Sequence, residues 1–389
     1  MTVSIVSIMR NRLARPVFRV IGVLLLTIGS ISCVMCLAGC EKKRPNRIGI
    51  PFEISPDGKI LFFSIGPQRL KGESAGFKTQ LYTLNTGETI PKPVSELAEL
   101  NILGITWYPD ISLQKALLTE FSPENKRPPH LFELTITNGQ AMVSPVILPK
   151  DIIIQFFPTW GFWGWSPNKQ IIAGGVRDLS KDVPTTLGIS YDNFKNIIIT
   201  DIGKGFGKVV WTDNRTLYIH ADNGDILEVC VEEGKARVTR TVARASTEDV
   251  NMPDEIKGVE EMRAYWERLH ASAKYVYMAG EINGKLVYCV DNDIFLGDQL
   301  LFHCEQDIWG LQFMTSGSFL AFKAGTCAWV LDGESNVINQ KEIGKYTILA
   351  ALSSSDKFVY LVNGYQTIER YSFVGDDEVH TIFNVNELE

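Results

Sequence analysis

The segment Gly72-Glu-Ser74-Ala-Gly76 has the residue types and spacing of a catalytic nucleophile. A Gly-x-Ser-x-Gly elbow holds its serine on a strained turn between a strand and a helix, where the hydroxyl can attack a carbonyl carbon. Residues 77–84, which follow the motif, have the composition of a strand instead of a helix. We therefore expect residues 66–79 to form a loop between two strands, and we predict no catalytic residue in this chain.

A second segment, Gly203-Lys-Gly205-Phe-Gly207-Lys208, has the glycines and lysines of a phosphate-binding loop. Such a loop works by opening a helix whose N-terminal amides face the anion. Here the segment lies between two predicted strands, residues 197–202 and 209–211, so a turn between strands is expected. The five histidines are dispersed along the chain, and the part after residue 40 contains neither Cys-x-x-Cys nor His-Glu-x-x-His. We predict no metal site and no cofactor.

The residues Leu37-Ala-Gly39-Cys40 end an apolar segment that follows four arginines and contains no acidic residue. A basic start, an apolar centre and an exit of small residues are the parts of a secretory signal. The four residues match the lipobox of bacterial lipoproteins at every position. This resemblance implies cleavage between Gly39 and Cys40, diacylation of the Cys40 sulfur and attachment to a membrane. The alternative is an uncleaved transmembrane helix. Translation can begin at Met1 or Met9.

These features divide the chain into a signal peptide (1–39), a lipidated polar tether (40–47) and a folded domain (48–389). The whole chain has a net charge of −7, and removing the four arginines of the signal leaves 34 basic and 45 acidic residues, a net charge of −11. That charge gives no reason to expect a nucleic-acid partner. Glu41 is not the aspartate that resembles an inner-membrane retention signal. We expect the outer membrane, at its periplasmic face, in a cell with two membranes, and otherwise the outer face of the cell membrane.

One phrase recurs through the folded part: an apolar strand, a small polar turn and a second apolar strand. The turns centre on Asp57, Asp110, Asn168, Asn214, Ala273, Gly317 and Asp356, at intervals of 53, 58, 46, 59, 44 and 39 residues. Units of this length, each with room for four strands, are typical of a β-propeller. We predict an all-β chain of seven four-stranded blades, with six blades as the alternative.

The phrase Ser55-Pro-Asp-Gly-Lys59 resembles the TolB-like, or PD40, propeller repeat, a relative of the WD40 type. Ser166-Pro-Asn-Lys169 matches the same repeat in part. This resemblance implies a β-propeller over most of the chain. One segment departs from the all-β pattern, because apolar residues recur at helical spacing between 253 and 270. We predict one inserted amphipathic helix there.

Cys230, Cys289, Cys304 and Cys327 remain after the predicted signal and the acylated cysteine are set aside. Export would place these four in an oxidising compartment, where three pairings are possible. Cys289 ends the predicted strand 286–290 and Cys304 ends 300–304, which we take as hairpin partners. A Cys289–Cys304 disulfide is therefore predicted, and four buried free thiols are the alternative.

Three predicted connections between second and third strands are long, residues 66–79, 120–129 and 176–186, whereas those of blades 4 to 7 are short. Loops on a rigid scaffold often carry function, and the aromatic stretch 156–165 can stack on a ligand or fill the core between blades. We predict a binding rim formed by Arg69, Lys71, Lys126, Arg127, Arg177, Lys181, Trp160 and Phe162. The alternative is that the long loops are insertions without function.

The sequence therefore favours a lipid-anchored propeller of the cell envelope that binds another envelope protein or a polymer without catalysis. The alternative is a propeller enzyme, a hydrolase or lyase that acts on sugars or lactones in the axial channel. An accessory role like that of TolB rests on fold analogy alone.

Overall fold

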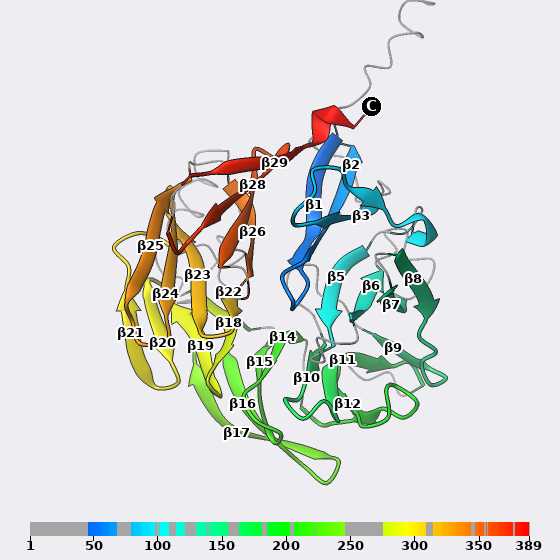
Figure 1. Cartoon of the computed structure of the whole chain (residues 1–389). Coiled ribbons are helices and arrows are strands. Elements are labelled where there is room, and N and C mark those ends of the chain that lie inside the picture. The colour runs from blue at the N-terminus through cyan, green and yellow to red at the C-terminus, as the bar shows by residue number, and fades with distance from the viewer. Residues whose placement is uncertain are drawn as a thin grey trace, which may run out of the picture. The chain divides into compact units, whose positions relative to one another are not determined.

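The computed structural model describes residues 46–67, 79–97, 100, 102–108, 114–120, 130–137, 140–154, 163–180, 185–202, 206–221, 223–245, 275–308, 314–343, 347–353, 355, 357–375 and 378–388. The unit Asn46–Glu389 contains seven antiparallel sheets arranged around an axis (Figure 1). The prediction of an all-β propeller with seven blades is confirmed. The predicted helix at 253–270 and the signal peptide lie outside the described residues. Within them, no helix has the length and apolarity to cross a bilayer.

Each blade is built from consecutive strands. Blade 1 contains β1 (Asn46–Ile54), β2 (Ile60–Pro67), β3 (Gln80–Asn85) and β4 (Lys92–Pro93), and blade 2 contains β5 (Ile102–Trp107), β6 (Lys115–Glu120), β7 (Leu131–Thr137) and β8 (Gln140–Pro145). Blade 3 contains β9 (Ile152–Ile154), β10 (Gly164–Trp165), β11 (Ile172–Asp178), β12 (Thr186–Ser190) and β13 (Ile198–Ile199). Blade 4 contains β14 (Phe206–Trp211), β15 (Thr216–Ala221), β16 (Ile226–Glu232) and β17 (Lys235–Ala243).

The last three blades repeat this order. Blade 5 contains β18 (Val276–Ile282), β19 (Lys285–Val290), β20 (Asp293–Leu296) and β21 (Gln299–His303), and blade 6 contains β22 (Met314–Ser316), β23 (Phe319–Ala324), β24 (Cys327–Asp332) and β25 (Val337–Glu342). Blade 7 contains β26 (Thr347–Ser353), β27 (Phe358–Asn363), β28 (Thr367–Ser372) and β29 (His380–Asn384). The 3₁₀ helices η1 (Ser95–Leu97) and η4 (Val385–Glu387) follow blades 1 and 7.

Burial falls from the inside of a blade to its outside. The second strand β2 is buried at its first six positions, because neighbouring blades cover both faces of the sheet. The fourth strand β17 is exposed at most positions and contains five basic or threonine residues on its surface. In blades 5 and 6 the first strands, β18 and β22, lie closest to the axis and the last, β21 and β25, lie at the circumference (Figure 1).

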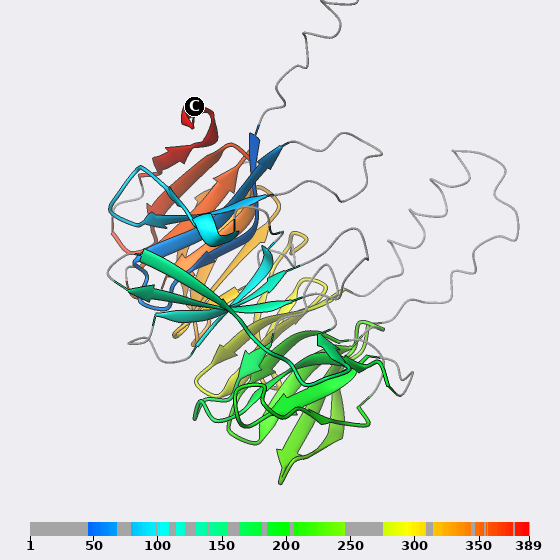
Figure 2. The same ribbon diagram turned by 90° about the vertical axis from the view of Figure 1, so that its right-hand side faces the viewer.

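Antiparallel order gives the propeller two ends, which Figure 2 shows from the side. At the turn end, a turn joins the first strand of a blade to the second and another joins the third to the fourth. At the loop end, the second strand leads to the third and each blade leads to the next. The turns around Asp57, Asn168, Asn214 and Gly317 all join a first strand to a second, as the repeat predicted.

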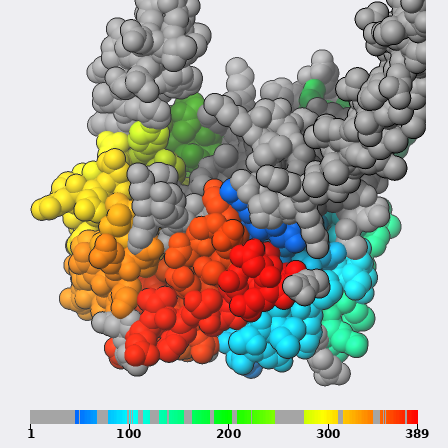
Figure 3. Space-filling view, turned by 90° about the horizontal axis from the view of Figure 1, so that it is seen from above, coloured from blue at the N-terminus to red at the C-terminus, as the bar shows by residue number. Residues whose placement is uncertain are grey.

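The seam between blades 1 and 7 closes the ring without exchange of strands, because each sheet contains only consecutive strands. An apolar cluster fills this seam, with Phe63 and Ile48 from blade 1 and Tyr360 and Phe383 from blade 7 among its members. The rings of Phe63 and Phe383 lie 5.4 Å apart. In Figure 3 the red residues of blade 7 lie against the blue and cyan residues of blade 1. The first blade is therefore held to the last by side-chain packing and by a few hydrogen bonds, such as that from the Ile48 amide to the Tyr365 carbonyl, without a shared strand.

Candidate functional site

The two Ser-Pro turns at the turn end have the same hydrogen-bond pattern. The Ser55 hydroxyl donates to Asp57 Oδ1 at 2.6 Å and its oxygen accepts from the Ile60 amide at 2.9 Å. In blade 3 the Ser166 hydroxyl donates to Asn168 Oδ1 at 2.7 Å and its oxygen accepts from the Ile171 amide at 3.0 Å. The serine thus satisfies the backbone of the turn, which is a structural role.

These turns also join neighbouring blades. Asp57 Oδ2 accepts from Gln114 Nε2 of blade 2 at 3.1 Å, and the Asp57 carbonyl accepts from the Ser355 hydroxyl of blade 7 at 3.0 Å. In the same way, the Asn168 amide of blade 3 donates to Asn214 Oδ1 of blade 4 at 2.8 Å. The polar residues of the repeat therefore connect the blades around the turn end.

Hydrogen bonding outweighs burial at Asp57. Burial alone would raise the pKa of this carboxyl, but bonds from Ser55, the Lys59 amide and Gln114, with the charge of Lys59, hold it below its usual range. A carboxyl with a lowered pKa stabilises the fold above its unfolded-state pKa, and this contribution is lost as the pH falls through the native pKa.

We expect Asp57→Ala to lower the free energy of unfolding by about 1–2 kcal/mol at neutral pH, since it leaves Ser55 and Gln114 without their acceptor. The effect should shrink in acid. In a cycle with Gln114→Ala, the two substitutions should couple by about 0.5–1.5 kcal/mol. Chemical denaturation of the four proteins measures this, and strict additivity would show that the bond between blades contributes nothing.

The second polar feature lies at the axis, on strands that contain a repeated irregularity. Five first strands have a β-bulge in their pairing with the second strand: β1, β5, β14, β18 and β26. A bulge leaves a residue outside the regular pairing and redirects its side chain. Lys208 lies in the bulge of β14, and its Nζ donates to the carbonyl of Ala279, the bulged residue of β18.

Glu53 of β1 is the acidic partner of Lys208 across the axis. The two residues lie on the innermost strands of blades 1 and 4, which are not neighbours in the ring. Glu53 is surrounded by protein but keeps a partly exposed surface. Burial raises the pKa of Glu53 to about 7, because loss of water disfavours the charged carboxylate, while the charge of Lys208 acts in the opposite direction. Burial also lowers the pKa of Lys208.

A carboxyl with a pKa near 7 can accept or donate a proton at neutral pH, which is what general acid–base catalysis requires. Catalysis also needs a nucleophile, a metal ion or a second acid–base group close to it. Among the described residues, no three histidine, cysteine, aspartate or glutamate side chains gather as a metal site would require. The axial pair is thus able to bind a polar group and to exchange a proton.

Neither residue of this pair is predicted as a site from the sequence, where Lys208 belongs to the glycine-rich segment expected to form a turn between strands. The turn prediction is wrong for residues 206–208, because they belong to β14; residues 203–205 lie outside the described residues. The signal in the sequence that could have indicated Glu53 is a single charged residue within the otherwise apolar first strand of a blade.

A groove of about 810 Å³ lies at the turn end between blades 3 and 4. The hairpin of β16 and β17 forms one wall, where the Gly234 amide donates to the Tyr191 hydroxyl of blade 3 at 3.3 Å. Its lining mixes both signs of charge and includes Arg215, Glu232, Lys235 and the half-buried Cys230. It is open to solvent and favours no single class of ligand.

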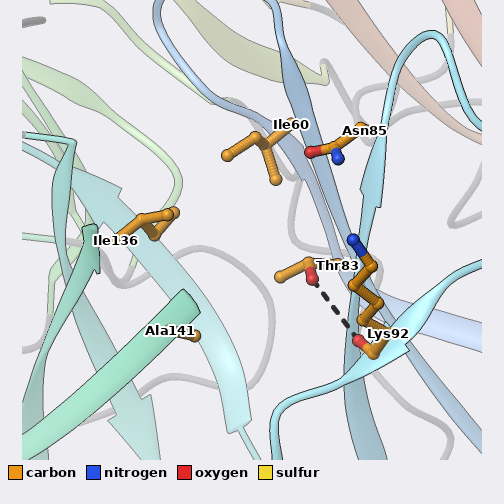
Figure 4. Close-up of a pocket in the computed structure, with 6 residues that line it drawn as sticks. All are labelled: Ile60, Thr83, Asn85, Lys92, Ile136 and Ala141. Carbon is orange, nitrogen blue, oxygen red and sulfur yellow. Dashed lines mark hydrogen bonds between the residues drawn. The ribbon is translucent and has the colours of Figure 1, made fainter. Parts of the chain in front are cut away.

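A smaller hollow lies between blades 1 and 2 (Figure 4). Ile60, Ile136 and Ala141 form its apolar side, and Thr83 donates to the Lys92 carbonyl at 3.4 Å on the other. Its volume of about 10 Å³ holds at most one water molecule. It is a packing gap and has no room for a substrate.

The predicted Cys289–Cys304 disulfide is wrong in this structure, in which both residues are free buried thiols. The prediction took β19 and β21 as hairpin partners, but β20 lies between them. Cys289 is opposite Ile294 of β20, and Cys304 follows the last residue of β21. Burial raises the pKa of Cys289 to about 12, so this sulfur is an unreactive thiol packed in the core.

The predicted rim residue Arg177 lies in strand β11, opposite Ile153 of β9, and not in a loop. The predicted loop 176–186 is therefore too long, because β11 ends at Asp178 and β12 begins at Thr186. The remaining predicted rim residues lie outside the described residues, as do the lipidation and cleavage positions: Arg69, Lys71, Lys126, Arg127, Lys181, Trp160, Phe162, Gly39 and Cys40.

The described part of the aromatic stretch fills the core. Trp163 is 5% exposed, and its ring packs edge-on against Phe194 at 4.8 Å. A Cβ atom at Gly174 would lie 2.4 Å from the Trp163 ring, so only glycine leaves room for it. Trp165 packs against Tyr108 of blade 2 at 4.7 Å. Trp163 is thus packed inside blade 3 and Trp165 against blade 2, and neither ring is available as a stacking platform.

Comparison with known proteins identifies the fold. No protein-family model and no curated protein match the chain. It is similar to the β-propeller domain of the trilobed protease from Pyrococcus furiosus, reported with an open velcro topology, at 10% identity and a TM-score of 0.53 over 88% of this chain and 99% of that chain. It is also similar to the acylaminoacyl peptidase of Pyrococcus horikoshii, at 11% identity and a TM-score of 0.54 over 90% of this chain and 54% of that chain.

A component of the COPII outer coat vertex on membranes is similar as well, at 10% identity and a TM-score of 0.52 over 87% of this chain and 89% of that chain. The chain thus spans about half of the acylaminoacyl peptidase and most of the coat component. At these identities the likeness concerns the fold alone. The chain is a seven-bladed β-propeller similar to the propeller domains of peptidases.

Proposed function

We propose that this protein is a lipid-anchored β-propeller of the cell envelope that binds another envelope protein or an envelope polymer, without catalysis. The observation that carries the binding role is the unequal length of the connections at the loop end. Between second and third strands, blades 1 to 3 have residues 68–79, 121–130 and 179–185, whereas blades 5 to 7 have residues 291–292, 325–326 and 364–366. A ring of equal blades has no structural need for this difference, which supports a specialised surface on blades 1 to 3.

A membrane anchor on Cys40 fits the position of the fold in the chain. Strand β1 begins at Asn46, two residues before the predicted start of the propeller. The whole propeller therefore follows the proposed acylated residue. The fold's occurrence in a coat component supports scaffolding as a use of such propellers, and its occurrence in peptidases supports the alternative of an enzyme.

The experiment replaces residues 68–78, the connection between β2 and β3, with a short glycine–serine linker. Partner recovery from solubilised membranes should be lost. Stability should barely change, because loop closure costs only about 0.6 kcal/mol per doubling of length. A glycine–serine segment of the original length is the matched control, and it separates the loop's side chains from its length. If both variants retain every partner, the loop is no part of a binding surface.

The enzyme alternative is favoured by one observation, the raised pKa of Glu53 at the axis. This alternative predicts hydrolase or lyase activity, which can be measured with sugar and lactone substrates. An activity that Glu53→Gln abolishes, with binding of partners unchanged, would place catalysis ahead of scaffolding.

A further inference from the structure

The first strand of the propeller begins at the loop end, close to the axis. The Ile48 amide donates to the Tyr365 carbonyl at 2.8 Å, and Tyr365 lies in the turn between β27 and β28 of blade 7. The Arg47 guanidinium lies over the Tyr365 ring, 4.7 Å from its centre. The start of the described chain is therefore fixed at this end by contacts with the last blade.

Only five residues, 41–45, separate Cys40 from Asn46. The six Cα–Cα steps between these two residues span at most about 20 Å even when fully extended. Strand β1 has nine residues, which separates the two ends of the propeller by about 30 Å. A chain that begins at the loop end thus cannot bring the turn end to a membrane in which Cys40 is anchored.

We propose that the loop end of the propeller lies against the lipid headgroups and that the turn end faces away from the membrane. The orientation rests on the acylation of Cys40 in the proposed function, and it adds which surface meets the lipid. The short tether imposes it, and the groove between blades 3 and 4 is then exposed to the aqueous side.

Charge supports the same orientation. Four basic residues lie within seven positions of the anchor: Lys42, Lys43, Arg44 and Arg47. Basic residues beside an anchored chain are attracted to anionic headgroups. The remainder of the mature chain is strongly acidic, so this basic segment is the part that an anionic surface attracts.

This orientation restricts the partner of blades 1 to 3. Their long connections leave the strands at the loop end, so a partner that binds them has to lie in the membrane or at its surface. A soluble partner is instead expected at the turn end. Membrane-associated partners can thus reach the loop end, and soluble partners can reach the turn end.

Photo-crosslinking to lipid tests this orientation. A benzophenone amino acid replaces Tyr365 at the loop end or Ile90, in the turn between β3 and β4, at the turn end; both are exposed apolar residues, by 40% and 73%. The acylated full-length protein is placed in vesicles of phosphatidylethanolamine and phosphatidylglycerol. We expect severalfold more lipid on the probe at 365. Equal or greater labelling from the probe at 90 would overturn the orientation.

A longer tether gives the matched control. About 20 glycine and serine residues between Pro45 and Asn46 add roughly 25 Å of flexible reach, and the preference for the probe at 365 should fall toward equality. A preference that the insertion leaves unchanged would show that the tether does not set the orientation.

Producing the same proteins in cells given labelled fatty acid separates the proposed anchor on Cys40 from the proposed orientation. Cys40→Ser should remove the acyl label and the lipid crosslinks together. If the unsubstituted protein has no acyl label, the proposed anchor fails. If it has the label but crosslinks equally from both probes, the orientation alone fails.

Discussion

Replacing Phe63 with alanine is expected to open the propeller at the seam between blades 1 and 7. Phe63 is fully buried in the cluster that closes the ring, against Phe383 and the other apolar residues of blade 7. Loss of a buried phenylalanine ring costs about 3–5 kcal/mol, from lost burial and from the cavity that remains. The first and last blades share no strand across this seam, so the loss falls where the ring is held only by packing and a few hydrogen bonds.

The neighbouring Phe62 provides the matched control. It is also fully buried on β2, but its ring faces blade 2 and packs against Trp107 at 5.1 Å. We expect Phe62→Ala to lower the melting temperature by a similar amount, because the chemical change is the same. Amide hydrogen exchange should distinguish the two variants. Only in Phe63→Ala should the amides of β1 and blade 7 exchange through local opening, with a free energy of opening lower than that of global unfolding. Equal exchange in the two variants would contradict a weak point at the seam.

The number of blades could be predicted from the sequence because the signal is local and repeated. Ser55, Asp57 and Gly58 satisfy one turn through bonds within a few residues, and Ser166 and Asn168 do the same in blade 3. The residues that form such a turn are adjacent in the sequence, so each copy of the repeat marks the turn of the first hairpin in its blade. Other turns kept the spacing with different residues, which was enough to count seven.

The disulfide prediction failed for the opposite reason. It required a strand order, and the four-residue strand β20 lies directly after the polar run Asp291-Asn292. Those polar residues form the tight turn between β19 and β20, but in the sequence they look like part of a longer loop. When β20 is overlooked, the segment of β21 is taken as the third strand of the blade, which wrongly places Cys304 next to Cys289.

The axial pair could not be found from spacing at all. Two blades lie between Glu53 and Lys208 along the chain, and only closure of the ring brings their strands to one axis. Lys208 also depends on a bulge, which changes the direction of its side chain without a clear sign in the sequence. Contacts of this kind come from the geometry of the whole fold.

The second large effect that we expect is at Glu53. Because its pKa is raised to about 7 from a usual value of 4.5, the native state holds this proton at pH values where the unfolded state has lost it. Stability therefore falls as the pH rises from about 4.5 to about 7, and this loss is constant above pH 7. An ionised Glu53 at pH 8 thus destabilises the fold.

We expect Glu53→Gln to raise the free energy of unfolding at pH 8 by roughly 1–3 kcal/mol, since one pKa unit corresponds to about 1.4 kcal/mol and the partly exposed carboxylate keeps some water. Below pH 4.5 the carboxyl is protonated in both the native and the unfolded state, so its titration should contribute no difference in stability between the variant and the original protein. Denaturation across this pH range measures the difference. A variant that is less stable at pH 8 would show that the ionised carboxylate is favourable where it lies.

The contribution of Lys208 to this balance follows from a cycle with Lys208→Met. In the original protein, removing the positive charge should raise the pKa of Glu53 further and should destabilise the fold at pH 8, because the carboxylate loses the charge that offsets its burial. In the Glu53→Gln background the same substitution should cost less, since only the bond to the Ala279 carbonyl is lost. Equal costs in both backgrounds would mean that the two charges do not interact across the axis. A smaller cost with glutamine would show that the acid and the base, which lie on blades 1 and 4, interact across the axis.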